Sequence, residues 1–237
     1  MQIAIITPTP NIISTFVQAS IVRKSINNKV INLSIINLRD FGIGTYRQID
    51  DAPFGGGDGM VMMAKPLQKA IEHAINLVGG TDNLQIIFPS PQGEKWDQKS
   101  AETLSKIKKI ILICGHYKGI DERIINKYVT KQISMGDYIL TNGEIPAMVI
   151  LDSISRLMPG TLNNLNSALT DSFSYGLLDH PHFTQPREFE GMSVPDVLLS
   201  GHHKNIQSWR KNIREKLTKE KRPDLWESFI KVKEPEC

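Results

Sequence analysis

The chain has 237 residues, of which 40% are hydrophobic and 22% charged, and its formal net charge is +3. These proportions are typical of a globular protein and exclude a disordered or fibrous chain. Its longest apolar runs fall far short of the ~20 residues that cross a bilayer. Pro8 and Pro10 interrupt the first apolar stretch, which argues against a signal peptide, and two cysteines make no disulfide framework. We therefore expect a cytoplasmic protein with no membrane partner.

Short runs rich in Ile and Val alternate with amphipathic stretches over the first 160 residues. Strands are predicted at 3–7, 30–38, 84–88, 110–114 and 132–140. Helices are predicted between or after them, at 12–24, 65–77, 97–106, 121–128 and 146–158. This alternation predicts an α/β domain whose parallel sheet is covered by helices on both faces.

The sequence pattern changes after this first domain, which we place at 1–160. Asparagines and weak periodicity predict a flexible interdomain linker over 161–175. Two helical patterns follow, at 202–217 and 223–230, and they predict a small basic helical domain over 176–237.

The charge is distributed unevenly along the chain. Between residues 201 and 233, ten Lys or Arg stand against four Asp or Glu, so this segment carries +6 and the rest of the chain −3. A basic segment is typical of a phosphate-binding surface, although a solvated helix face has the same composition. The nearby histidines match no zinc spacing and have no cysteine beside them, so no metal site is predicted at His180, His182, His202 or His203.

Three glycine-bearing loops follow predicted strands, at 89–93, 114–119 and 140–146. Ligands of open α/β sheets bind at the carboxyl ends of strands, so these loops are candidates for one pocket. None carries the glycine pattern of a dinucleotide site or a phosphate loop, which argues against a nucleoside triphosphate. Such loops also occur purely as turns, and the residues alone leave both interpretations open.

A fourth glycine-rich segment contains four glycines within 55–59. It is a candidate lid, or a backbone surface that a ligand approaches closely. Its flanking carboxylates, Asp50, Asp51 and Asp58, would bind a cation, repel RNA or simply be solvated.

Two further residues are candidates for proton and charge chemistry. Asp171 lies in the predicted linker, where a carboxylate that folds over a pocket would serve as a general base. Arg156 lies near the end of the last helix of the first domain and would present a cation to developing negative charge. On the residues alone, a structural role is the commoner one for each of them.

Several motifs carry a resemblance along the chain from residue 1 to about residue 230. They are Gly55-Gly56-Gly57 and the segments 90–93, 115–123, 136–148, 171–173, 176–179 and 195–201. Together they resemble the bacterial tRNA (guanine-N1-)-methyltransferases, the TrmD family of the SPOUT class. Three positions depart from the family motif: Lys118 stands where the family usually has Glu, Asn142 where it usually has Gly, and Asp58 where Pro is commoner.

The resemblance implies a trefoil knot in the C-terminal part of the α/β domain, and a homodimer whose active sites are each built from both subunits. It also implies that the glycine-bearing loops hold S-adenosyl-L-methionine in a bent shape. The cofactor-binding residues would be Pro89, Ser90, Pro91, Gln92, Gly93, Gly115, Tyr117, Lys118, Ile133, Ser134, Met135, Gly136, Tyr138, Ile139, Leu140, Asn142, Gly143, Pro146 and Asp179.

The implied reaction transfers a methyl group to N1 of guanosine 37 of tRNA, next to the anticodon. The resemblance makes Asp171 the general base and Arg156 the stabiliser of negative charge, and it gives the basic domain the anticodon stem-loop to bind. Members of the family are also linked to Mg²⁺, so the resemblance makes Mg²⁺ a candidate second cofactor. The alternatives are a SPOUT-class methyltransferase with another RNA target and a non-catalytic RNA-binding protein.

Overall fold

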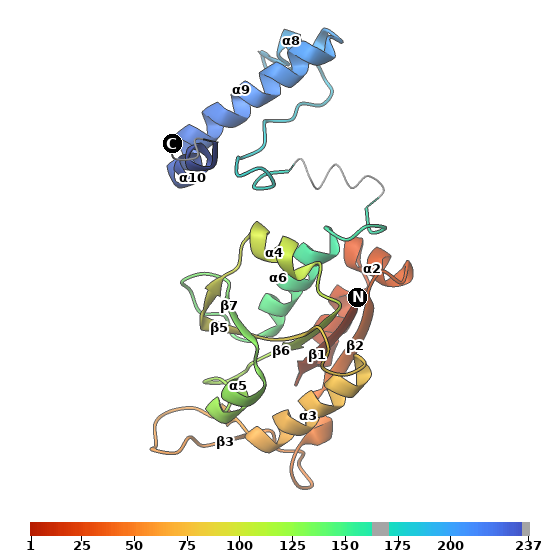
Figure 1. Ribbon diagram of the computed structural model, residues 1–237, viewed down its shortest axis with the longest axis vertical. Helices are drawn as coiled ribbons and strands as arrows, with labels where there is room; N and C mark the ends of the chain where they lie inside the picture. Colours follow the sequence, from red (N-terminus) through yellow and green to blue (C-terminus); the bar gives the residue numbers. More distant parts are fainter. Residues whose placement is uncertain (163–170, 234–237) are drawn as a thin grey trace. The chain divides into compact units, whose positions relative to one another are not determined.

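The computed structural model describes residues 1–162 and 171–233. The chain divides into two compact units, Met1–Leu165 and Asn166–Cys237 (Figure 1). Most of the predicted linker, residues 163–170, lies outside the described residues.

A five-stranded sheet forms the centre of the first unit, with the strand order β2-β1-β6-β5-β7 (Figure 1). Every neighbouring pair is parallel, and in register Ile5 lies between Ile35 of β2 and Leu112 of β6. The strands are β1 (Gln2–Thr7), β2 (Asn32–Asn37), β5 (Leu84–Lys95), β6 (Lys109–Ile113) and β7 (Lys131–Ser134). The predicted α/β class with a parallel sheet is confirmed.

Helices cover both faces of this sheet because successive strand residues point to opposite sides. Ala4 and Ile6 of β1 pack in one apolar core with α3 and α5, whereas Ile3 and Ile5 pack in a second core with α1, α2, α4 and α6. Burial of each such isoleucine contributes roughly 1.5–3 kcal/mol. The helices are α1 (Pro10–Phe16), α2 (Ser20–Asn27), α3 (Ala64–Leu77), α4 (Gln98–Leu104), α5 (Glu122–Tyr128) and α6 (Glu144–Ser155).

Three predicted elements of this unit were wrong in extent. The strand expected over 84–88 continues to Lys95, because the chain resumes its pairing with β7 at Glu94. The single helix expected over 12–24 is two helices, because Ser20 adopts a φ of 59°, which a continuous α-helix does not accommodate. The strand expected over 132–140 ends at Ser134, since the chain turns away at Gly136, whose φ is 131°. The pattern also missed the short elements η1 (Leu38–Phe41), β3 (Asp50–Asp51) and β4 (Val61–Met62).

Within its described residues, 171–233, the second unit contains three helices and a short hairpin. Its helices are α8 (Asp196–Leu199), α9 (His203–Lys221) and α10 (Pro223–Lys233), and its hairpin pairs β8 (Glu188–Phe189) with β9 (Met192–Ser193). The segment before the hairpin is hydrogen-bonded to α9: the amide of Leu178 donates to Oγ1 of the buried Thr218 at 2.9 Å. Residues 171–175, the end of the predicted linker, belong to a tight turn in which the amide of Phe173 donates to the carbonyl of Leu177 at 2.7 Å.

The backbones of β5 and β7 approach each other very closely at Gly93. β5 leaves its pairing with β7 after Pro89 and resumes it at Glu94. Within this excursion, a Cβ on Gly93 would lie well inside 3.0 Å of the backbone of Gln132 and Ile133. Because the obstacle is backbone rather than a flexible side chain, only glycine fits there.

Gly93→Ala tests this close approach of the two backbones. We expect it to lower the free energy of unfolding by about 2–3 kcal/mol, the range of an overpacked core position. Urea unfolding measures the loss, and Lys99→Ala on an exposed face of α4 is the matched control, expected to stay within about 0.5 kcal/mol. If Gly93→Ala lowers the free energy of unfolding by no more than the control does, the close backbone approach at Gly93 is contradicted.

Candidate functional site

A cavity of about 390 Å³ lies in the first unit, where residues 88–91 of β5 and the loops after β6 and β7 meet the first turn of α6. Its size is in the range of small-molecule sites. Its wall is formed by residues 88–91, 115–119, 133–136 and 138–143 and by Pro146. All three glycine-bearing segments contribute to this one cavity, although residues 89–91 belong to β5 and not to a loop after it, and Gln92 and Gly93 do not line it.

Most residues that the resemblance assigned to a cofactor lie in this wall. Gln92 and Gly93 do not: Gln92 is exposed, and Gly93 lies against the backbone of β7. The wall also includes Phe88, His116, Gly119 and Thr141, which the sequence analysis did not select although each adjoins a selected loop residue. The side chains that line the cavity are mostly apolar or hydroxyl-bearing, and Lys118 is the only Lys, Arg, Asp or Glu among them.

A buried carboxylate lies directly behind this wall. Glu144, the first residue of α6, has a fully buried side chain and accepts hydrogen bonds from the hydroxyls of Thr7 and Thr9, the latter at 2.9 Å. Nε2 of His116, a residue of the wall, lies 2.9 Å from both carboxylate oxygens. Burial raises the pKa of Glu144, but the hydrogen bonds from His116, Thr7 and Thr9 lower it by more, so this pKa lies below its usual value.

The charge of Glu144 fixes the tautomer of its partner. An ionised carboxylate only accepts hydrogen bonds, so Nε2 of His116 must carry a proton. The sequence analysis did not select Glu144 or assign a role to His116. The two residues are 28 positions apart in the sequence, and only the folded chain brings them into contact.

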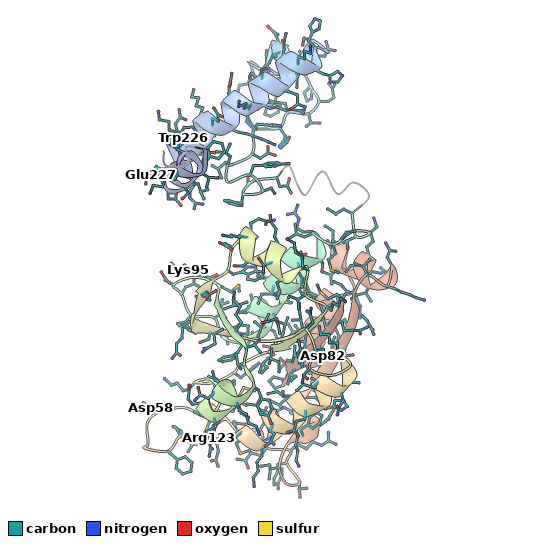
Figure 2. All side chains as sticks on the ribbon, in the orientation of Figure 1. Asp58, Asp82, Lys95, Arg123, Trp226 and Glu227 are labelled. Carbon is teal, nitrogen blue, oxygen red and sulfur yellow. The ribbon has the colours of Figure 1, made fainter. Side chains whose placement is uncertain are left out.

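The glycine-rich segment 52–60 adjoins the cavity wall at its end. The amide of Lys118 donates to the carbonyl of Met60, and the amide of Met62 donates to that of Gly119, both at 3.0 Å. The carboxylates of Asp50, Asp51 and Asp58 do not form a group of candidate metal ligands, so the structure does not support the cation-binding alternative for them. Asp58 lies on the exposed loop labelled in Figure 2.

Asp50 instead influences a residue of the cavity wall. Burial raises the pKa of the Tyr117 hydroxyl, and the nearby charge of Asp50 raises it further. Tyr117 also adopts a φ of 58°, a left-handed conformation that is uncommon for an aromatic residue.

The remaining predicted site residues lie outside this cavity. Arg156 is the half-buried C-terminal cap residue of α6 in the first unit. Asp171 and Asp179 belong to the second unit. Their predicted roles therefore stay predictions.

Asp179 is the centre of a polar cluster in the second unit. Its Oδ1 accepts from Nη2 and Nε of Arg214 at 2.6 and 2.9 Å, and its Oδ2 lies 3.0 Å from Nε2 of His182. Burial raises the pKa of Asp179, and the hydrogen bonds from Arg214, the amide of His180 and His182 lower it by more. The carboxyl is therefore ionised at neutral pH.

This cluster brings together three groups that can bind metals. The ligand atoms of Asp179, His180 and His182 all lie within 4.8 Å of one another, a grouping that the spacing along the chain did not predict. The guanidinium of Arg214 already neutralises the carboxylate whose charge a divalent cation would need.

Comparison with known proteins places these features in a family. Residues 1–228 match the family described as tRNA (Guanine-1)-methyltransferase TrmD. The chain belongs to this family. It is 45% identical to the tRNA (guanine-N(1)-)-methyltransferase of Clostridioides difficile over 95% of this chain and 97% of that protein. It is 44% identical to the enzyme of the same name from Anoxybacillus flavithermus over 97% of this chain and 93% of that protein.

The match to the family spans both units, so it includes the cavity and the basic helices. Methyltransferases of this kind use S-adenosyl-L-methionine in general. No helix within residues 1–162 and 171–233 is long and apolar enough to cross a membrane.

The buried carboxylate gives a pH-dependent prediction. Glu144→Gln leaves the Thr7, Thr9 and His116 donors without a charged acceptor, so we expect a loss of about 2–4 kcal/mol in the free energy of unfolding at pH 7. Because the pKa of Glu144 is lower in the folded state, the stability it provides is present above its unfolded pKa of about 4.3 and is lost as the pH falls through the folded value. The difference between wild type and variant should therefore narrow below about pH 4.

Urea unfolding between about pH 7 and pH 3 measures this difference. Asp82→Asn, which changes an exposed loop carboxylate labelled in Figure 2, is the control and should show no comparable loss. A destabilisation of Glu144→Gln that is constant across this pH range would contradict the ionised state of Glu144.

Proposed function

We propose that this protein methylates N1 of guanosine 37 of tRNA, next to the anticodon, with S-adenosyl-L-methionine as the methyl donor. The observation that carries the proposal is the family match over residues 1–228, which includes both the cavity and the basic unit. The cavity at the carboxyl ends of β5, β6 and β7 supports it, because that edge is where ligands of open α/β sheets bind.

The residues of the cavity fit the proposed cofactor. A volume of about 390 Å³ suits a ligand of its class, and the glycines at 115, 119, 136 and 143 allow close approach of the backbone. The wall combines apolar surface from Phe88, Ile133 and Leu140 with exposed backbone groups, and an adenine ring requires both. When bound, S-adenosyl-L-methionine supplies an electrophilic methyl group on a sulfonium.

The acceptor requires two kinds of help from the protein. N1 of guanine carries a proton and is a poor nucleophile until that proton leaves. We assign Asp171 as the general base that takes it and Arg156 as the cation that stabilises negative charge developing on O6. Holding the base, the acceptor and the methyl donor together supplies the remaining advantage through proximity.

The rest of the proposal concerns assembly and RNA binding. The segment 201–233, with its charge of +6, would bind phosphates of the anticodon stem-loop, and each active site would combine residues from both subunits of a cytoplasmic homodimer. We also propose that residues 84–146 form the trefoil knot. The close backbone approaches at Gly93 and at Gly143, where a Cβ would lie 2.5 Å from the amide nitrogen of Gly115, agree with the tight packing that such a topology requires.

The family link to Mg²⁺ finds no matching donor set. Mg²⁺ prefers oxygen ligands, and none of the residues that line the cavity is acidic. In the described part of the chain, the one group of three candidate metal ligands is Asp179, His180 and His182, which offers two nitrogens and a carboxylate already paired with Arg214. No step of the reaction is assigned to Mg²⁺.

Methyl transfer to anticodon stem-loop transcripts tests the proposal. With labelled S-adenosyl-L-methionine, we expect label on the transcript with the target guanosine and none on a transcript in which it is replaced. Asp171→Ala should lower the rate of transfer by about 10²–10⁴-fold, the usual contribution of a general base. Asp82→Asn should retain the wild-type rate.

Other outcomes would favour the alternatives. Label that persists after replacement of the guanosine would indicate another RNA target. RNA binding without label by the wild type would indicate a non-catalytic RNA-binding protein. An Asp171→Ala variant as fast as the wild type would exclude Asp171 as the base.

A further inference from the structure

A single charged side chain lines the cavity of the first unit. Lys118 is exposed, and no ion pair joins it to a carboxylate of the described residues. The other residues of the wall contribute apolar groups, hydroxyls, an amide and the imidazole of His116. The ammonium of Lys118 is therefore available to a ligand.

The position of this lysine is constrained at both its backbone and its stem. Its amide donates to the carbonyl of Met60 at 3.0 Å. Its stem passes close over Gly59, where an added Cβ would lie 3.0 Å from Cγ and 3.2 Å from Cε of Lys118. The lysine stem therefore packs on the glycine-rich segment, and less side-chain freedom is lost when the ammonium binds a ligand.

The chemistry of the proposed cofactor selects one partner for this ammonium. S-adenosyl-L-methionine carries a sulfonium, an α-ammonium and an α-carboxylate, and a lysine attracts only the carboxylate. We propose that Lys118 binds the α-carboxylate of the methionine portion and thereby sets which end of the cofactor lies at the loop after β6. This inference rests on the proposed function, because it presumes that the cavity holds this cofactor.

The assignment predicts selectivity between two neutral-sulfur ligands. S-adenosylhomocysteine keeps the α-carboxylate, whereas 5′-methylthioadenosine has the same adenosyl thioether and lacks the amino-acid portion. Lys118→Met keeps most of the stem that packs on Gly59 and removes the charge. We expect it to weaken S-adenosylhomocysteine binding by about tenfold, the scale of one charge-assisted hydrogen bond, and to leave 5′-methylthioadenosine binding unchanged.

Isothermal titration calorimetry with the full chain measures both affinities. Lys118→Arg should retain most of the S-adenosylhomocysteine affinity because it keeps the cation. Lys69→Met, at an exposed lysine of α3 away from the cavity wall, should change neither affinity. Added salt should weaken S-adenosylhomocysteine binding to the wild type more than to Lys118→Met.

Each contrary result identifies what has failed. Equal weakening of both ligands by Lys118→Met would assign Lys118 a structural role and overturn the proposal, as would no weakening of either. If Lys118→Met weakens only the binding of the anticodon stem-loop, the lysine contacts RNA instead of the cofactor and the proposal is overturned. If neither ligand binds the wild type, the proposed cofactor use fails together with this inference. If both ligands bind the wild type and Lys118→Met leaves the ratio of their two affinities unchanged, only the inference is overturned.

Discussion

The buried carboxylate of Glu144 joins three segments that are far apart in the sequence. Thr7 and Thr9 follow β1, His116 follows β6, and Glu144 itself begins α6. A charge in the interior is tolerated only where hydrogen bonds replace its hydration, and here three donors do so at the amino end of a helix, where a negative charge is favoured. Loss of any one donor would leave the charge incompletely compensated, so the three segments are held in one arrangement.

Gly143, the residue before Glu144, adds a backbone contact between two of these segments. The amide of Gly143 donates to the carbonyl of Gly115 at 2.8 Å, and neither position has space for a side chain without movement of its neighbours. The loop after β6 and the first turn of α6 are thus joined by a backbone contact and, one residue further along, by the pair of His116 and Glu144. Both loops line the cavity, so its walls keep their spacing before any ligand binds, which lowers the entropy cost of binding.

Local patterns were enough to predict the sheet and the loops at its edge, but not the contacts that set the cavity. A short run rich in isoleucine predicted β1, and glycines after the predicted strands made one pocket a candidate. Nothing local marks Ser20 as a break between two helices or Gly93 as a point of close backbone approach, because both depend on φ values or neighbours that only the folded chain defines. The pairing of Glu144 with Thr7, 137 residues away, was likewise beyond any periodicity.

The two charges at the cavity have opposite signs and lie at different depths. Glu144 is ionised and buried one layer behind the wall, and its field is felt nearby, since burial and then the charge of Glu144 raise the pKa of the Cys114 thiol. Lys118 is exposed on the wall itself. Because the interior screens charges less than water does, an anion behind the wall and a cation on it polarise the space between them. A ligand that carries both signs of charge therefore has a preferred orientation in such a field, and the field favours that orientation more strongly than it does for a neutral ligand of the same shape.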